Sequence, residues 1–106
     1  MSSAVSEYQA LVAAFSSNEN VNSGQMFGKP CLKIGGKAFV AQHLETIVFK
    51  LEGAAHAKAM KIMGAALWDP SGKGRPMKEW VALPATGAKE LKLYASSAMA
   101  YVLSAL

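Results

Sequence analysis

The fold of this chain is decided by residues 31–51, which read CLKIGGKAFVAQHLETIVFKL. Apolar and polar side chains alternate on both sides of Gly35 and Gly36, the pattern of a strand with one buried face. Glycine tolerates positive φ, so this pair suits the two-residue loop of a tight hairpin. The chain then returns over residues 37–42, turns again and runs on over residues 46–51. The stretch predicts a three-stranded antiparallel meander with one face free to pack on helices.

Segments on both sides of the meander have helical periodicity. Residues 4–17 form an expected first helix, and residues 52–63 an alanine-rich second helix that Gly64 would end as its C′ residue. A last helix is expected after Thr86, its predicted N-cap. The first helix has its apolar stripe at Val5, Tyr8, Leu11, Val12 and Phe15. The last has its stripe at Leu91, Tyr94, Ala95, Ala98, Tyr101, Val102 and Ala105.

Two short strands complete the predicted sheet. Residues 65–68 are apolar and end at Asp69 and Pro70, while residues 77–83 follow a loop rich in glycine and proline. The expected fold class is therefore α+β, with an antiparallel sheet of about five strands packed by helices in the order α-β-β-β-α-β-β-α. With 106 residues, the chain is expected to form a single domain over residues 1–106.

Composition narrows the class of protein more than its activity. About half of the residues (52%) are apolar and 17% are charged, which argues against disorder. The formal net charge of +4 permits an acidic or nucleic-acid partner without requiring one. Cys31 is the only cysteine, so an internal disulfide is excluded and an intracellular location is favoured. The N-terminus resembles no signal peptide and no apolar run is long enough to span a bilayer, so we expect a cytoplasmic protein without a membrane partner.

Three short motifs carry a family resemblance. They are MFGKPCLKI at residues 26–34, GKAF at residues 36–39 and GKGRPMKEW at residues 72–80. Their order and spacing, within the expected order of helices and strands, resemble the N-terminal domain of the TfoX/Sxy family. YjbR/MmcQ-like proteins are looser relatives. The likeness covers roughly residues 25–106.

This resemblance implies an α+β domain with an antiparallel sheet and a regulatory role. The family takes its name from longer proteins that regulate competence genes and carry a second, helical C-terminal domain. The resemblance covers only the N-terminal domain of those proteins, so we expect this chain to lack the C-terminal one. The family supplies no agreed catalytic residues and no cofactor to place on this sequence.

The loop at residues 72–78 is the best candidate site in the sequence. Its glycines would let backbone N–H groups approach an anion, and Lys73, Arg75 and Lys78 would supply positive charge. The spacing is not that of a Walker motif. A solvated loop whose glycines only satisfy turn geometry explains the same residues. We expect weak anion or nucleic-acid binding there, with a salt dependence set by the three cations.

No catalytic or metal-binding constellation is visible. Cys31 lacks a Cys-x-x-Cys partner and is expected to behave as a small apolar side chain. His43 and His56 lack the spacing of metal ligands, so we expect both to be exposed to solvent. Asp69 and Glu79 flank the candidate loop and could meet across it, although a turn residue and a surface charge are the simpler interpretation. The sequence therefore predicts no catalytic residues, no metal and no cofactor.

Large side chains near the motifs have two alternative roles. Phe27, Trp68 and Trp80 could form an aromatic platform for a base, but an aromatic core is the better interpretation. We expect the ring of Trp80 to be buried. The last helix keeps further apolar residues off its main stripe, which suggests a weak homodimer. These residues are Leu93, Met99, Leu103 and Leu106.

Two classes of function remain open from the sequence. The first is a non-catalytic binding or regulatory module that acts through an unknown protein partner or nucleic acid. The second is a small-molecule or anion-binding protein, which could be an enzyme, built around the 72–78 loop. A cleft lined by Trp68, Arg75 and Glu79 would favour the second class, and a flat apolar or basic face would favour the first.

Overall fold

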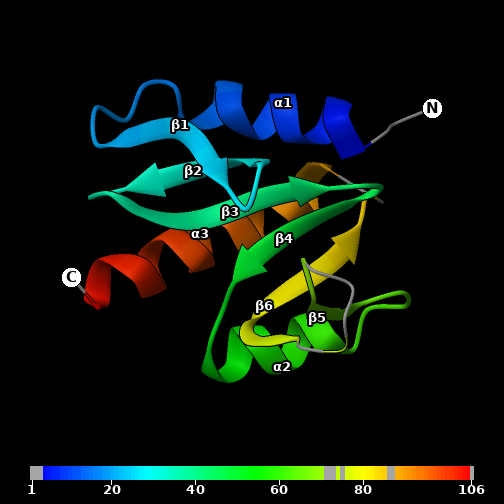
Figure 1. The fold of residues 1–106 in the computed structure, drawn as a ribbon. Coiled ribbons are helices and arrows are strands. Elements are labelled where there is room, and N and C mark those ends of the chain that lie inside the picture. The colour runs from blue at the N-terminus through cyan, green and yellow to red at the C-terminus, as the bar shows by residue number, and fades with distance from the viewer. Residues whose placement is uncertain (1–3, 71–73, 75, 86–87, 106) are drawn as a thin grey trace.

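The computed structural model describes residues 4–70, 74, 76–85 and 88–105. These residues form an α+β fold, as predicted (Figure 1). The helices are α1 (Ala4–Phe15), α2 (Gly53–Met60) and α3 (Ala88–Ser104). The strands are β1 (Val21–Met26), β2 (Lys29–Ile34), β3 (Lys37–His43), β4 (Thr46–Lys50), β5 (Ala66–Trp68) and β6 (Met77–Pro84). The order is the expected one with one further strand, β1, before the meander.

The six strands form one antiparallel sheet in the order β1-β2-β3-β4-β6-β5. The meander predicted from residues 31–51 is confirmed as β2, β3 and β4. Gly35 and Gly36 both have positive φ, 58° and 80°, as a two-residue hairpin loop requires. The second hairpin, β5 and β6, joins the sheet through β6, which pairs with β4 from Thr46↔Pro84 to Lys50↔Trp80.

Strand β1 was not expected, because its sequence VNSGQM shows no apolar alternation. It lies at the edge of the sheet and pairs with β2 over its whole length, from Val21↔Ile34 to Met26↔Lys29. An edge strand with few buried side chains is held mainly by its backbone ladder, and a sequence pattern does not report this ladder.

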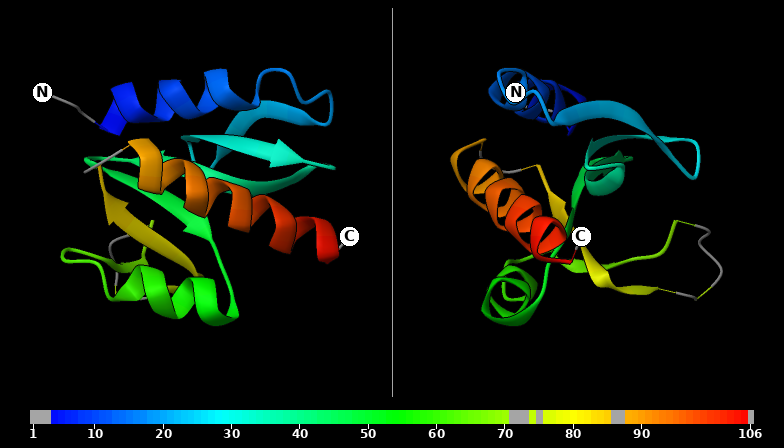
Figure 2. Two further views of the ribbon diagram at one scale, coloured as in Figure 1. Left: turned by 180° about the vertical axis from the view of Figure 1, so that it is seen from behind. Right: turned by 90° about the vertical axis from the view of Figure 1, so that its left-hand side faces the viewer.

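All three helices lie on the same side of the sheet (Figure 2). The larger hydrophobic core fills the space between α1, α3 and the sheet, and its aromatic members come from both helices and from β3 and β4. Fully buried side chains of this core include Phe39, Val40, Ile47, Phe49, Val81 and Leu83. The opposite side of the sheet has no helix among the described residues. We call this side the helix-free face.

The buried side of α1 differs from the expected stripe. Val5 is exposed, whereas Ala4 and Glu7 are buried together with Tyr8 and Leu11. Burial of Glu7 is unusual for a carboxylate, and its Oε2 atom has no hydrogen-bond partner. Tyr8, Leu11 and Phe15 are nevertheless buried and Val12 packs against the core, so the expected stripe is confirmed except at Val5. A stripe drawn from apolar residues alone could not include the buried carboxylate.

The second helix is shorter than predicted. It ends at Met60 with Lys61 as its C-cap, so Gly64 is not its C′ residue. The amide of Lys61 bonds the Lys58 carbonyl at 3.2 Å, and that of Ala65 bonds the Ile62 carbonyl at 3.0 Å. These i→i−3 bonds show tight turns after the helix, which helical propensity alone does not separate from the helix itself.

The last helix follows its prediction closely. Leu91, Tyr94, Ala95, Ala98 and Val102 are buried, Tyr101 is half-buried, and only Ala105 of the expected stripe is exposed. The expected N-cap, Thr86, lies outside the described residues.

Candidate functional site

The candidate loop is described only in part. Lys73 and Arg75 lie outside the described residues, and Lys78 is exposed on β6. The amide N–H of Gly74 donates to Asp69 Oδ2 at 2.8 Å, with Gly74 at a φ of +79°. The Gly74 N–H, which was expected to be free to bind an external anion, therefore already binds the Asp69 carboxylate. Binding by Lys73, Arg75 and Lys78 stays a prediction.

The two carboxylates beside this loop have different partners. Glu79 accepts a hydrogen bond from the Tyr101 hydroxyl on α3, whereas Asp69 binds Gly74 within the loop. Glu79 thus lies toward the helices, while Trp68 belongs to the cluster on the helix-free face. Trp68 and Glu79 therefore lie on opposite sides of the sheet, and Arg75, the third residue of the expected cleft, lies outside the described residues.

The helix-free face carries a second buried cluster made only of strand residues. Its buried members are Cys31, Ala41, Val48, Trp68, Trp80 and Ala82, with Met26, Ala38 and Met77 packed against them. Strands β2, β3, β4 and β6 supply the middle of the cluster. The edge strands β1 and β5 supply Met26 and Trp68. A sheet face without a helix is normally solvated on its outer side. Here side chains from the sheet itself exclude water.

A row of small residues makes room for the large rings. Gly24, Cys31, Ala41, Val48, Ala82 and Ala66 lie opposite one another on successive strands across all six strands. Small side chains in register leave a shallow trough on a pleated sheet. The two tryptophan rings pack against this trough, which explains how Trp68 is only 3% exposed without a helix above it.

Trp68 is the centre of the aromatic contacts on this face. Its ring centroid lies 5.5 Å from that of Trp80, 6.1 Å from that of Phe27 and 6.0 Å from that of His43, each edge-to-face. Phe27 belongs to the first sequence motif, and Trp80 to the last. The structure therefore brings the two motifs together through Trp68, which lies between them in the sequence. Burial of Trp80 and Trp68 is as predicted, but Phe27 is 63% exposed.

A hydrogen bond fixes the protonation state of His43. The indole N–H of Trp68 donates to His43 Nδ1 at 2.8 Å. An indole can only donate, so Nδ1 must be the unprotonated nitrogen and the ring is neutral, with its proton on Nε2. Partial burial and the nearby Lys29 ammonium hold the pKa of His43 below its usual value of 6.5. All three influences favour the neutral imidazole.

The expectation that both histidines are exposed is wrong. His43 and His56 are half-buried, and each has a specific partner. His56 Nε2 on α2 donates to the backbone carbonyl of Lys78 at 2.8 Å, joining the helix to β6. These bonds link residues 22 and 25 positions apart, and no local pattern reports such contacts. No group of three metal-ligating side chains occurs in the described part of the chain.

Cys31 is fully buried in the helix-free cluster. Burial raises the pKa of its thiol, and the neighbouring Lys33 charge offsets this only in part. A protonated, inaccessible thiol is a poor nucleophile. The expectation that Cys31 serves as a small apolar side chain is confirmed, with more complete burial than expected.

The hairpin tip next to Trp68 has an unusual backbone. Phe27 and Gly28 form the two-residue loop between β1 and β2, with φ of 54° and 75°. Such loops favour Asn-Gly or Gly-Gly, because positive φ is unfavourable for a side chain of this size. Sequence reasoning treated Phe27 as core and missed this turn, although an X-Gly pair between two strands is a known signal for it.

The basic residues of the sheet divide into two groups. Lys29 and Lys33 flank Cys31 at two-residue spacing on β2 and therefore share the helix-free face. The Lys33 chain lies over Gly24 of the neighbouring strand, where an added Cβ would come within 3.1 Å of Lys33 Cε. Lys37 and Lys50 instead border a cleft under α3. Within the described strands Glu79 is the single carboxylate, against five lysines.

Compared with protein-family models, curated proteins and solved structures, the chain matches none of them. None of the described helices is long and apolar enough to cross a membrane.

Proposed function

We propose that this chain is a small, non-catalytic binding module that takes single-stranded nucleic acid on the helix-free face of its sheet. A regulatory, cytoplasmic role of the kind that the TfoX/Sxy resemblance implies is part of this proposal. The observation that carries it is Phe27, an exposed aromatic ring at a backbone position where asparagine or glycine would be less strained. Strain kept at an exposed position favours a function for the side chain, because folding gains little from it.

The surroundings of Phe27 support a polyanionic partner. Lys29 follows the hairpin tip on β2, and Lys33 lies further along the same face. Aromatic rings beside lysines are the usual surface for single strands, since each base offers a ring to stack on and each phosphate a negative charge. Duplex recognition in the major groove needs a helix or a two-stranded ribbon that can enter it. No helix lies on this face in the described residues, and Phe27 offers an exposed ring on which the base of a single strand can stack, whereas the bases of a duplex are already stacked on one another.

The buried tryptophans provide a firm base for this surface. Trp68 contacts Phe27 and is held in turn by Trp80 and His43. A ring that is fixed from behind loses little entropy when a base stacks on its exposed side. Lys78, exposed on β6, adds a further positive charge to the proposed surface, and Lys73 and Arg75 are included in the proposal from the sequence alone.

The test is a titration of labelled single-stranded DNA and RNA, followed by fluorescence anisotropy at several salt concentrations. Phe27→Asn suits the turn but removes the edge-to-face contact with Trp68, so the two effects should largely cancel and change the free energy of unfolding by no more than about 1 kcal/mol. The same variant should weaken binding by about 1–3 kcal/mol, the usual contribution of one stacked base. Weaker binding by a protein of nearly unchanged stability would separate function from folding.

The charge contribution is measured with a double variant, Lys29→Gln with Lys33→Gln. For each phosphate that the variant no longer binds, the slope of log K against log salt should fall by about 0.7. Lys58→Gln with Lys61→Gln removes two exposed lysines at α2, away from this face, and serves as the matched control. Equal losses from both double variants would mean nonspecific attraction and would contradict the proposed surface. Absence of binding at tens of millimolar salt would exclude nucleic acid and leave an acidic protein as the partner.

A further inference from the structure

A second site lies where the sheet separates into two parts. Strands β3 and β4 pair from Val40↔Phe49 to His43↔Thr46. Lys37 begins β3 and Lys50 ends β4, so both lie beyond the last paired residues. The strands diverge there, and the C-terminal half of α3 lies across the divergence in both views (Figures 1 and 2). This geometry leaves a cleft between strands that would otherwise be closed by backbone hydrogen bonds.

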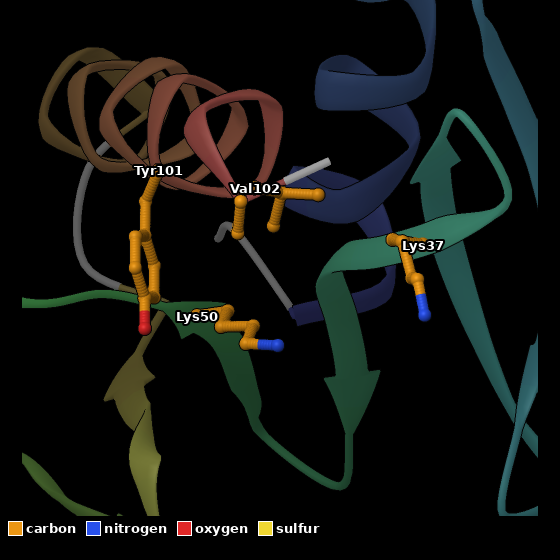
Figure 3. A pocket seen from close by; sticks show the side chains of 5 residues that line it. Lys37, Lys50, Tyr101 and Val102 are labelled. Atoms are coloured by element: carbon orange, nitrogen blue, oxygen red, sulfur yellow. The ribbon is translucent and has the colours of Figure 1, made fainter.

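The cleft has a volume of about 160 Å³ and is lined by Lys37, Lys50, Tyr101, Val102 and Ala105. Figure 3 shows the Tyr101 ring along one wall and Val102 on the side of the helix, with Lys50 extending below the helix and Lys37 at the border of the cleft, its Nζ directed away from α3. A dry cavity of roughly 150 Å³ is large enough for benzene. The volume therefore fits one ring-sized molecule, and the walls from α3 offer it apolar and aromatic contacts.

The charges of the cleft are unbalanced. Neither Lys37 nor Lys50 forms an ion pair within the part of the chain that the structure describes. Lys50 Nζ instead lies 6.0 Å from the centroid of the Tyr101 ring, at the outer limit of a cation–π contact. Two ammonium groups at one small site repel each other, and a bound anion would relieve that repulsion.

The nearest carboxylate is already engaged. Glu79 accepts a hydrogen bond from the Tyr101 hydroxyl, at the end of the ring away from its Cβ. This bond is the main reason that the pKa of Tyr101 rises to about 12, and the charge of Glu52 adds to the effect. Tyr101 therefore stays neutral at physiological pH and its ring is held in place as a wall. Glu79 and Glu52 place negative charge at the hydroxyl end, so an anion is favoured at the lysine end.

We propose that this cleft binds a small aromatic carboxylate. The ring would pack between Tyr101 and the apolar side chains of α3, and the carboxylate would lie at Lys37 and Lys50. The cleft lies under α3, whereas Lys29 and Lys33 lie on β2, and it takes a single small molecule in place of a polymer.

The test is a titration of the isotopically labelled chain with benzoate, followed by backbone amide shifts in NMR spectra. Benzamide is the matched probe, since it has nearly the same shape and no charge. Benzoate should bind with a Kd near the millimolar range, which is usual for so small a ligand. The largest shifts should fall at Lys37, Lys50 and residues 101–105. Benzamide should bind about tenfold or more weakly.

Variants separate this site from the nucleic-acid surface. Lys37→Gln and Lys50→Gln should each weaken benzoate binding by about five- to tenfold, because each removes a charge-assisted contact. Lys33→Gln, on the helix-free face, should leave it unchanged. A single-stranded oligonucleotide that binds the helix-free face should not displace benzoate, so either proposal can fail without the other.

Three results would overturn the proposal. Equal affinity for benzoate and benzamide would show an apolar pocket without anion selection. Inorganic phosphate that competes as well as benzoate would show a general anion site in which the ring contributes nothing. Benzoate shifts that persist in both lysine variants, with spectra that confirm the fold, would place the ligand elsewhere.

Discussion

The two faces of the sheet are buried by different means. On the face covered by helices, α1 and α3 supply Tyr8, Leu11, Leu91 and Tyr94 to a core of aliphatic and aromatic strand residues. On the helix-free face, two tryptophans from the β5–β6 hairpin cover a row of small residues. The first face excludes water with separate elements, and the second with its own side chains. The comparison teaches that large rings on small neighbours can bury a sheet face without another layer.

The faces also differ in their chemistry. The helix-covered core is held by dispersion and the hydrophobic effect, which tolerate exchanges of similar volume. The helix-free cluster contains the hydrogen bond between Trp68 and His43 and the charge of Lys29 beside it. A hydrogen bond depends on donor and acceptor positions, so this face should be more sensitive to chemical identity and to pH.

The largest expected effects come from one aromatic ring on each face. Phe49→Ala removes a fully buried ring that packs on Tyr94, and Trp80→Ala removes a neighbour of Trp68. Each should lower the free energy of unfolding by about 3–5 kcal/mol, measured by chemical denaturation. If the alanine variants do not fold, Phe49→Leu and Trp80→Phe allow the same comparison of the two faces with a smaller loss of stability. A denaturation midpoint that barely moves for Trp80 would break the comparison, because the helix-free cluster would then add little stability.

A smaller effect is expected for Trp68→Phe. This variant keeps an apolar ring but removes the indole donor, so His43 Nδ1 loses its partner. The free energy of unfolding should fall by about 1–3 kcal/mol, and the pKa of His43 should rise because protonation of Nδ1 is no longer opposed by a facing N–H. NMR titration of the imidazole measures the second effect. Trp80→Phe is the control, since it reduces ring size on the same face and should leave the His43 titration nearly unchanged.

Acidic pH should weaken the helix-free face selectively. The pKa of His43 is lower in the folded chain than its usual value of 6.5, so the unfolded chain takes up this proton first as pH falls. The stability due to His43 is therefore present above about pH 6.5 and is lost as pH drops through the folded pKa. His43→Gln keeps an acceptor for Trp68 but cannot titrate. As pH is lowered from 7 to 5, the wild type should lose stability relative to this variant. A stability difference that stays constant over this range would contradict the assignment.

The smallest expected effect is self-association through the outer side of α3. Leu93 and Leu103 are 53% and 46% exposed, whereas Met99 is half-buried with Asn18 beside it and Leu106 lies outside the described residues. Ten residues of helix place Leu93 and Leu103 about 80° apart around the axis, so they form a broken patch and not a stripe. A weak homodimer stays our prediction. Light scattering at high micromolar concentration should detect it, and Leu93→Lys should abolish it.

Sequence reasoning recovered the parts of the fold that repeat locally. The Gly35–Gly36 turn and the stripe of α3 are determined by residues that are close in the sequence, and both are confirmed. Strand β1 was not predicted, because an edge strand is held by backbone hydrogen bonds that leave no side-chain pattern. The burial of Glu7 was not predicted, because an apolar stripe is drawn from apolar residues and leaves out a carboxylate.

The candidate site was harder to predict, because its contacts join distant segments. Trp68 and His43 are 25 positions apart, and their bond depends on β5 lying across β6 from the meander. The sequence did identify Phe27, Trp68 and Trp80 as a group with two alternative roles. The structure divides them: the tryptophans are buried and Phe27 is exposed. Lys37 and Lys50 border a cleft that the sequence does not reveal, since the separation of β3 from β4 cannot be inferred from alternation.

The order of the strands has a consequence for how this chain folds. Four of the five strand pairings join neighbours in sequence, and only the ladder between β4 and β6 joins residues 30 to 38 positions apart. Hairpins close in microseconds, whereas formation of this ladder also closes a long loop that contains α2 and β5. We therefore expect docking of β6 on β4 to limit the folding rate. Substitutions at Val48 or Ala82 should slow folding, while changes in the β1–β2 hairpin should mainly speed unfolding.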